Sequence, residues 1–389
     1  MKRTSTWASY LILTLLCLGT VANGDDKQSV DVKPYGYVKL DGSYDQNLTS
    51  HGNYVMWVNP QSYEDDDAQF NMTANQTRLG LKMTSEGTGS VEVRGAIEFD
   101  LYAAGAAENK AELQLRHAYF TVTSGQFELT AGQTWDLVSP LNPATLNYSV
   151  LWGCGNTGYR RPQVRLTYTV PAGSSTDVSL AGGFFRTIGS DLTPTFSLAL
   201  DESSDGSDDG TDAAIPSFQG ALDLKHRFGD KGLFRLGVSG LYGQLRAETN
   251  KGNYETYESQ GIWGHLMLQM PSGLGVSGEF YTGTNLGGYL GGILQSSTIA
   301  GVESIGCWGS AWVKISPKVK LTGGYGYDDV KDEDIATGRS QNSCVFGNLT
   351  YALVSNVTVG VEVSRWETDY RDGESASSMR GQSSFMLNF

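Results

Sequence analysis

The stretch "NVTVGVEV", Asn356–Val363, decides the fold class because its residues alternate strictly in polarity. Four valines occupy one set of positions, and Thr358, Gly360 and Glu362 occupy the other. A period of two residues indicates a β-strand with one apolar face. The same alternation recurs in "VEVRGAIEFDLY", Val91–Tyr102, and in the closing stretch "SSFMLNF", Ser383–Phe389. About sixteen segments of this kind follow one another from Val32 onward.

The connections between these segments are unequal in length, with short turns alternating with long polar loops. The expected short turns are Ser85–Ser90, Ser124–Gln126, Pro171–Thr176, Gly229–Gly232, Pro271–Gly273, Ser316–Lys318 and Val354–Asn356. The expected long loops include Gln46–Asn71, Trp135–Arg161, Thr187–Ile215, Leu286–Ser304 and Val330–Ser340. Outer-membrane barrels have short periplasmic turns, long extracellular loops and apolar faces toward lipid. The pattern therefore predicts an all-β transmembrane antiparallel barrel, whereas a soluble β-sandwich would leave the asymmetry unexplained.

The bulk composition fits an ordered, exported protein. The chain has 389 residues, a net charge of -14 and only 39% hydrophobic residues, but it carries 20 Tyr, 14 Phe and 8 Trp. So many aromatic residues argue against disorder. The acidic balance argues against nucleic acid as a partner, because phosphate backbones are bound by Lys and Arg.

The first 24 residues are typical of a secretory signal peptide. Lys2 and Arg3 precede the apolar core Leu11–Leu18, and small residues end at Gly24. A membrane anchor is the rival interpretation, but the core is about half the length needed to span. A lipoprotein processed at Cys17 is a second alternative, which the bulky Leu16 disfavours. We expect a signal peptide at residues 1–24 and an outer-membrane barrel at residues 25–389.

The remaining cysteines, Cys154, Cys307 and Cys344, are odd in number and widely spaced. This spacing matches neither a disulfide framework nor a metal site. We therefore expect no metal, no cofactor and export without disulfides.

Charged residues on the polar phase predict a basic lumen. In "QTRLGLKM", Leu79 and Leu81 face lipid, so Arg78 and Lys82 face the lumen. Each basic side chain would cost about 2–4 kcal/mol at the midplane if it faced lipid. The same phase places Arg94, Arg116 and Arg165 inward, with Glu98 and Glu112 on the shared surface.

The segment Trp135–Arg161 follows the fifth expected strand and is long enough to fold inward and narrow the pore. An ordinary surface loop is the alternative. The segment contributes only Asp136 as an acid, and Arg160 and Arg161 stand at its return to the barrel.

Other motifs do not point to chemistry. "GLGVSG", Gly273–Gly278, lacks the strand-before and helix-after context of a dinucleotide site. The acidic run Asp201–Asp212 lacks EF-hand spacing and fits a solvated outer loop better than a calcium site. The four histidines, His51, His117, His226 and His265, are too scattered to predict a catalytic set. We expect no catalytic residues and no enzyme.

Several stretches resemble the sixteen-stranded porins of Gram-negative bacteria, specifically the DcaP-like porins. The matching stretches span the first six strands: "GYVKLDGSYD" (Gly36–Asp45), "QTRLGLK" (Gln76–Lys82), "IEFDLY" (Ile97–Tyr102), "LRHAYF" (Leu115–Phe120), "AGQTW" (Ala131–Trp135) and "RRPQVRLTY" (Arg160–Tyr168). The spacing of "RHAY" and "GQTW" is the most specific of these signals. The second half of the chain matches only as a barrel pattern.

The resemblance implies a homotrimer in the outer membrane, with one water-filled pore per protomer and the third loop folded into each lumen. It also implies small anionic, often carboxylate-bearing solutes, with Arg78, Arg116, Arg160, Arg161 and Arg165 at the constriction. Two departures stand out. This chain has "PATLNY", with Ala144 and Asn147, where the family loop carries a "PETLDF"-like run. Only Asp25–Asp31 precede the barrel, where some relatives have a coiled-coil segment.

The terminal alternation of Phe385, Leu387 and Phe389 predicts a strand that closes the barrel. It resembles the signal by which bacterial assembly machinery recognises outer-membrane barrels. The partners expected are therefore this machinery through Phe389, outer-membrane lipid and lipopolysaccharide, and small anionic solutes.

Three functions follow from a barrel of this kind: a passive diffusion porin, a non-conducting adhesin or scaffold, and a barrel hydrolase. The inward arginines favour the porin, because neither alternative needs them. Ions are sorted at the narrowest part of a pore, where low-dielectric walls focus the field. We therefore expect mild anion preference despite the negative net charge.

Overall fold

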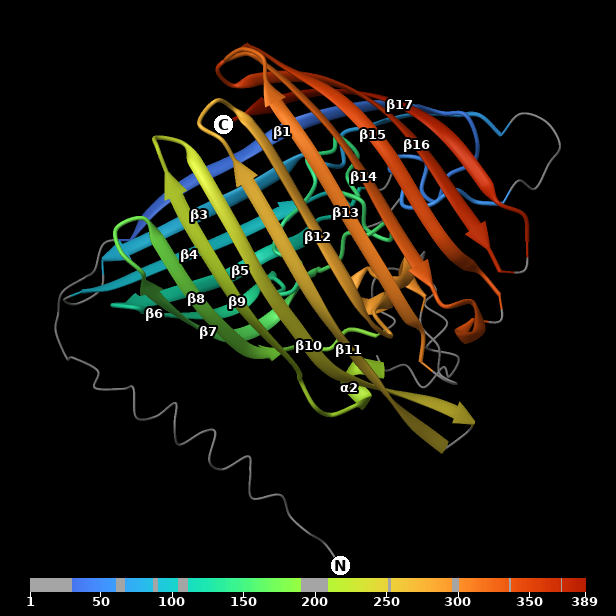
Figure 1. Cartoon of the computed structure of the whole chain (residues 1–389), viewed down its shortest axis with the longest axis horizontal. Helices are drawn as coiled ribbons and strands as arrows, with labels where there is room; N and C mark the ends of the chain where they lie inside the picture. Colours follow the sequence, from blue (N-terminus) through green and yellow to red (C-terminus); the bar gives the residue numbers. More distant parts are fainter. Residues whose placement is uncertain are drawn as a thin grey trace, which may run out of the picture.

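The computed structural model describes residues 30–60, 67–86, 90–103, 111–189, 209–250, 253–295, 301–335, 337–371 and 373–389. These residues form a closed barrel of antiparallel strands (Figure 1). The predicted signal peptide lies outside them, as does most of the acidic run Asp201–Asp212. Among the described helices, none is long and apolar enough to cross a membrane.

The strands follow the alternating segments of the sequence. The first eight are β1 (Asp31–Asp45), β2 (Gln69–Thr73), β3 (Arg78–Glu86), β4 (Val91–Asp100), β5 (Gln114–Ser124), β6 (Phe127–Trp135), β7 (Arg160–Pro171) and β8 (Thr176–Phe185). The next nine are β9 (Ser217–Phe228), β10 (Gly232–Asn250), β11 (Asn253–Gln269), β12 (Leu274–Thr284), β13 (Glu303–Lys314), β14 (Val319–Val330), β15 (Arg339–Val354), β16 (Val357–Tyr370) and β17 (Ala376–Asn388).

The barrel closes where the last strand pairs with the first. β17 pairs with β1 from Tyr37↔Asn388 to Asp45↔Arg380. The other edge of β1 is shared, because its first half pairs with β3 and its second half with β2. β2 and β3 thus occupy one position, and the barrel has 16 strand positions with one extra strand. The predicted barrel of about sixteen strands is confirmed.

The two faces of each strand have opposite chemistry, as the alternation predicted. On β17, Phe385 and Leu387 are 56% and 43% exposed on the outer face, while Gln382 and Ser384 are buried inside. Phe389 continues the outer face, and its backbone exchanges two hydrogen bonds with Gly36 on β1. The large exposed apolar residues thus lie where a membrane covers them.

The connections at one end are two to four residues long, at 87–90, 125–126, 172–175, 229–231, 270–273, 315–318 and 355–356. Those at the other end are mostly long, at 46–68, 101–113, 136–159, 186–216, 285–302 and 331–338. The strict alternation of short and long has two exceptions, at 251–252 and 371–375. At the first, β10 and β11 extend by pairing with each other well beyond the rim (Figure 1).

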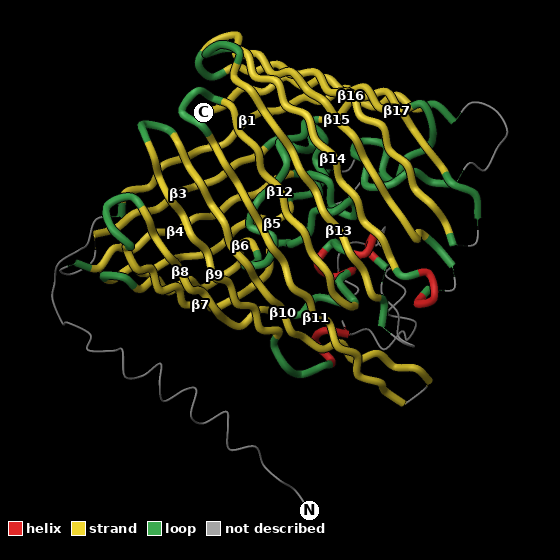
Figure 2. The backbone as a smooth tube through the Cα atoms, viewed as in Figure 1, coloured by secondary structure: helices red, strands yellow, loops and turns green. Residues whose placement is uncertain are grey.

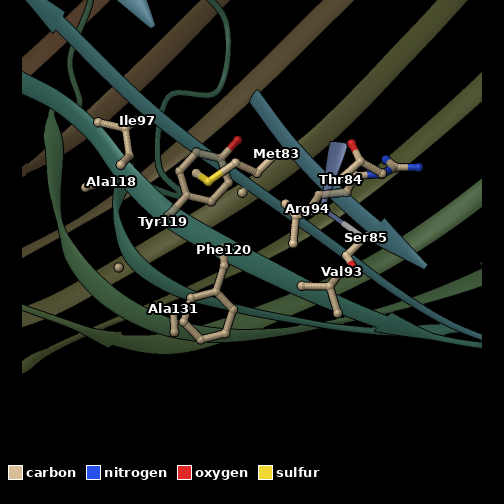
Figure 3. Close-up of a pocket in the computed structure, with 13 residues that line it drawn as sticks. Met83, Thr84, Ser85, Val93, Arg94, Ile97, Ala118, Tyr119, Phe120 and Ala131 are labelled. Atoms are coloured by element: carbon tan, nitrogen blue, oxygen red, sulfur yellow. The ribbon is translucent and has the colours of Figure 1, made fainter. Parts of the chain in front are cut away.

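The outer face of β3–β6 carries an apolar groove of about 510 Å³ (Figure 3). Met83, Val93, Ile97 and Phe120 form its larger walls. Small residues on the same face, such as Ala131, leave room between these side chains. The barrel surface is therefore not uniformly smooth toward its surroundings.

Loop segments fill part of the barrel interior (Figure 2). Residues from four long loops form one buried cluster, with Tyr54 and Met56 from loop 46–68, Tyr102 from loop 101–113, Tyr148 and Trp152 from loop 136–159, and Leu290 and Leu294 from loop 285–302. The last loop contains two short 3-10 helices, η2 (Gly287–Tyr289) and η3 (Gly292–Leu294). The sequence predicted an inward fold for loop 136–159 alone.

Candidate functional site

Loop 136–159 crosses the lumen and is held by carboxylates on the opposite wall. On β12, Glu279 accepts hydrogen bonds from Leu141 N at 2.8 Å and Ser139 Oγ at 2.5 Å. On β16, Glu362 accepts one from Leu146 N at 2.7 Å. Backbone N–H groups of an inward loop have no strand partner, so inward carboxylates satisfy them. The predicted inward fold of this loop is confirmed.

Loop 136–159 also packs directly against the backbone of the wall. Gly155 has a φ of +90°, and a Cβ there would lie 2.0 Å from the carbonyl oxygen of Cys307 on β13. Only glycine accommodates both the left-handed backbone and this approach. The loop tip is therefore seated on the wall with no side chain between them.

Arg116 connects the middle of loop 136–159, at Tyr148, to β4 and β5. This guanidinium is buried and lies 2.8 Å from Glu98 and 2.6 Å from Asp100. The Tyr148 hydroxyl, from the loop, donates to Asp100 at 3.2 Å. Burial, with Asp100 nearby, raises the pKa of Tyr148, so its hydroxyl keeps the proton it donates. Arg116 thus links the wall to the loop.

A β-bulge explains the inward direction of Arg116. Across β4 and β5, Glu98 faces His117 but Phe99 faces Leu115, so Arg116 is the extra residue. Arg116 and His117 therefore both point inward, and Tyr119 keeps the inward phase after them. The sequence contains a signal for this bulge. Leu115 and Phe120 are an odd number of residues apart, so both can face lipid only if the period of two is broken between them.

The other predicted lumen residues of β3 and β4 lie in different settings. Arg78 is partly buried, 3.4 Å from Glu98. Lys82 is exposed, with its Nζ 4.7 Å from the Tyr35 ring centroid. Arg94 is exposed and pairs with Glu92 at 2.7 Å, three residues from the start of β4 at the short-turn end.

Arg160 and Arg161, at the return of the loop, are both fully buried. Arg161 Nε lies 2.8 Å from Asp136 Oδ1, and its guanidinium lies over the Tyr289 ring. Arg160 lies between the rings of Trp135 and Tyr159, at 4.9 and 4.6 Å. None of the three Arg160 nitrogens has a hydrogen-bond partner within the described part of the chain.

A cavity of about 790 Å³ runs along the wall from the short-turn end, at Gly125 and Pro171, up to the loop at Leu137 and Asn142. Its walls come from β5 to β11. The basic side chains that line it are Arg165, Lys225, Arg235 and His265, and the acidic ones are Glu128, Asp136, Asp177 and Asp223. The cavity is therefore in contact with both the short-turn end of the barrel and the loop.

The acids of this cavity are largely neutralised. Asp223 faces three basic groups: Arg235 at 2.7 Å, His265 at 2.8 Å and Lys225 at 3.7 Å. Asp136 pairs with Arg161, and Asp177 pairs with Arg227 at 2.6 Å. Of these four acids, only Glu128 forms no ion pair with a described residue.

Arg165 is the least compensated cation of the cavity. Its Nη1 donates to the Trp135 carbonyl at 3.3 Å and to Gln163 at 3.2 Å. Its Nε has no partner in the part of the chain that the structure describes. Glu128, on the neighbouring strand, attracts this guanidinium electrostatically but forms no ion pair with it among the described residues.

Sequence reasoning missed the basic residues of β9–β11. The same period of two would have placed them, because Leu222 and Leu224 face outward beside Lys225, and Leu236 faces outward beside Arg235. The contact between His265 and Asp223 had no sequence signal. This contact crosses β10 at Gly237. A Cβ there would lie 2.5 Å from the His265 ring, so the absence of a side chain leaves room for the contact. The described residues contain no group of three or more His, Cys, Asp or Glu that could hold a metal.

Comparisons with known proteins give one family and several similar folds. A family model described as Gram-negative porin matches residues 13–371. No curated protein matches the chain. Among solved structures, the outer membrane channel DcaP of Acinetobacter baumannii is similar, with a TM-score of 0.73 and 20% identity over 95% of this chain and 100% of that one.

Two more distant structures share the fold. The anion-selective porin from Comamonas acidovorans has a TM-score of 0.57 and 11% identity, covering 93% of this chain and 100% of that one. The trimer form of OmpT from Vibrio cholerae has a TM-score of 0.55 and 12% identity, again with 93% and 100% covered. At these identities the likeness concerns the fold alone.

Proposed function

Because the chain belongs to the family of Gram-negative porins, we propose that its channel in the outer membrane passes small hydrophilic anions, carboxylates above all. The family consists of channels rather than enzymes, and the adhesin or scaffold alternative is not favoured. Solutes cross passively, so selection depends on the charges they meet in the lumen.

The charge balance of the 790 Å³ cavity carries this proposal. Its acids Asp136, Asp177 and Asp223 are paired, whereas Arg165 has no carboxylate partner and Lys225 is an additional cation beside Asp223. A carboxylate that enters the cavity therefore meets uncompensated positive charge. An amine of similar size meets mainly Glu128.

The loop's return adds to the positive potential. Arg160 is buried without an acid partner among the described residues, and aromatic faces surround its guanidinium. A charge in a low-dielectric setting acts over a longer range than one in water. Arg160 thus contributes to the field at the constriction although it is not exposed there.

We assign the predicted pore residues two roles on this basis. Water-accessible charges that solutes meet directly are Arg78, Lys82, Arg94 and Arg165. Residues that hold the loop and so define the constriction are Arg116, Asp136, Arg160 and Arg161. The first group acts on selectivity and the second on pore shape.

Swelling of proteoliposomes tests the proposal. Vesicles with purified protein should swell faster in the salt of a small carboxylate than in the salt of an amine of similar size. The counterions of the two salts are chosen to have equal permeability. Equal rates for the two solutes would leave a porin without charge preference. Absence of swelling in either would remove the channel function itself.

A homotrimer is the assembly we propose. OmpT of Vibrio cholerae has been solved in a trimer form, and the apolar groove on β3–β6 offers a surface that a second copy would cover. Unheated detergent extracts should migrate near three times the protomer mass and collapse on boiling. A protomer-sized band in gentle detergent would contradict the trimer.

The outer-membrane partners follow from the ends and rims of the barrel. Phe389 is 57% exposed at the seam between β17 and β1, which suits recognition by the assembly machinery. Deletion of Phe389 should leave protease-sensitive, unassembled protein, and a normal yield of folded barrel would contradict this role. The outer apolar face contacts membrane lipid, and the long-loop rim faces lipopolysaccharide.

A further inference from the structure

Cysteines that are far apart in the sequence converge on one wall of the barrel. Cys154 lies near the tip of loop 136–159, and Cys344 lies on β15; both are fully buried in one cluster with Leu151 and Trp308. Cys307, on β13, is only partly buried. All three are free thiols in this structure.

The direction of each side chain selects one pair. Trp308 points into the lumen toward Glu279, so its neighbour Cys307 has the outward phase of β13. Across β14 and β15, Cys344 faces Gly326, and Gly326 in turn faces Trp308 on β13. Cys344 therefore has the inward phase, on the same side of the sheet as the loop. Cys307 is on the opposite side.

The Cys154 thiol occupies the space above Gly326. A Cβ on Gly326 would lie 3.3 Å from Cys154 Sγ and 2.2 Å from the Cys154 carbonyl oxygen. Directly opposed residues of an antiparallel pair have Cβ atoms about 4.5–5.5 Å apart. Cys154 Sγ thus stands beside Cys344 where the missing side chain of Gly326 would face it. The same Sγ lies 3.9 Å from the carbonyl oxygen of Asn342, two residues before Cys344.

We propose that Cys154 and Cys344 form a disulfide that fastens the tip of loop 136–159 to β15. Disulfides join Cβ atoms about 3.5–4.5 Å apart, and Cys154 Sγ occupies the space directly opposed to Cys344, so rotation about χ1 would bring the two sulfurs together. An outer-membrane protein matures in an oxidising compartment, where disulfides persist. The sequence alone predicts no disulfide, because 190 residues of unrelated pattern separate the two cysteines.

The chemistry needs an external disulfide as oxidant. One cysteine thiolate attacks that disulfide to form a mixed disulfide, and one oxidant sulfur leaves as a thiolate. The second cysteine thiolate then displaces the other oxidant sulfur. The two cysteines lose two electrons and two protons, and the oxidant is reduced to a dithiol. Burial raises the pKa of the Cys154 thiol, so little thiolate is present once the loop is docked.

This crosslink would fasten the loop at the end farthest from its roots. Arg161 and Asp136 hold the roots near β6 and β7, whereas Gly155 and Cys154 contact β13–β15. The inference does not depend on the charge preference of the channel.

Thiol counting on individual peptides tests the proposal. Folded barrel is extracted from membranes, acid-quenched, unfolded without reductant and alkylated, and each cysteine-containing peptide is quantified. We expect Cys307 to be fully alkylated, Cys154 and Cys344 to be unmodified, and a peptide pair joining them to disappear on reduction. Full alkylation of all three cysteines would overturn the proposal, as would a Cys154–Cys307 pair.

Substitutions supply the matched controls. C307S should leave the crosslinked pair intact, because Cys307 is on the opposite side of the sheet. In C344S, Cys154 has lost its disulfide partner and should be alkylated after the chain is unfolded. Protein refolded with reductant present should contain three thiols, whereas protein refolded with a small-molecule disulfide as oxidant should contain the Cys154–Cys344 pair. If folded barrel obtained with the oxidant lacks this pair, the geometry does not support the bond.

Discussion

The wall of β3–β5 and the wall of β7–β11 both point basic side chains inward, but these side chains are in different electrostatic states. Arg116 on β5 is buried between Glu98 and Asp100. Arg165 on β7 has no carboxylate partner among the described residues and lines the open cavity. An inward direction therefore does not by itself make an arginine available to a solute. Its partners decide whether it supports the loop or acts on ions.

The largest effect should come from Arg116. R116Q leaves Glu98 and Asp100 buried without their main cation, and breaking a buried pair costs about 3–5 kcal/mol. We expect the variant to unfold at a clearly lower temperature, measured as the loss of the unboiled band on a heating series.

Arg94 provides the matched control on the neighbouring strand. Its pair with Glu92 is exposed, and such pairs contribute about 0–1 kcal/mol. R94Q should melt like the wild type. Equal melting of R116Q and wild type would contradict the supporting role of Arg116.

The two walls also differ in how well the sequence predicts them. The alternation of residues places strands, turns and inward phase, since lipid outside and water inside impose one rule on every strand. It placed Arg78, Arg94 and Arg165 inward, and it would have placed Arg235 in the same way. Alternation carries no information on what a side chain meets after it enters the lumen.

The interior contacts depend on loops that have no period. Sequence reasoning did not predict that Glu279 and Glu362 would hold loop 136–159, nor that loops 46–68 and 285–302 would pack with it. These contacts join residues from 92 to 216 positions apart through irregular backbone. The bulge at Arg116 is intermediate in predictability between the strands and the loop contacts. Its signal is local in the sequence, but it appears only as a break in the period of two.

An intermediate effect should come from the carboxylate that holds the loop. E362Q keeps the shape of the side chain but removes its charge, which weakens the hydrogen bonds from Leu146 N and Asn147 N. Loss of a buried charged acceptor costs about 1–3 kcal/mol. We expect larger current fluctuations in single channels, because the constriction loop is less firmly held.

Glu367, on the same strand, serves as the control for this change. It is half exposed and pairs with Arg365 outside the lumen. E367Q should leave the current fluctuations at the wild-type level. Quiet channels in E362Q, or noisy ones in E367Q, would locate the support of the loop elsewhere.

The smallest effect should be a pH dependence in loop 46–68. Burial, with Arg339 nearby, lowers the pKa of His51 to about 4. In the unpacked loop, His51 takes up a proton near its ordinary pKa of about 6.5. In the packed loop, His51 stays neutral until about pH 4. His51 therefore disfavours packing progressively as the pH falls through this window. Hydrogen exchange of this loop should rise between about pH 7 and pH 5, after correction for intrinsic rates.

H51Q removes this titration and should flatten the difference between the two pH values. The exchange of loop 285–302 serves as an internal reference, because it packs in the same cluster without a histidine among its described residues. An unchanged pH response in H51Q would assign the effect to other groups.

The central claim is that the cavity along β7–β11 sets anion preference, and the reversal potential of single channels tests it most directly. In a tenfold salt gradient an ideally selective channel reaches about 59 mV, and we expect a fraction of this with the anion sign. R165Q combined with K225Q should move the potential toward the cation sign. R365Q, with the same type of charge change outside the lumen, should leave it in place. A cation-selective wild type, or an equal shift in R365Q and the double variant, would contradict the account.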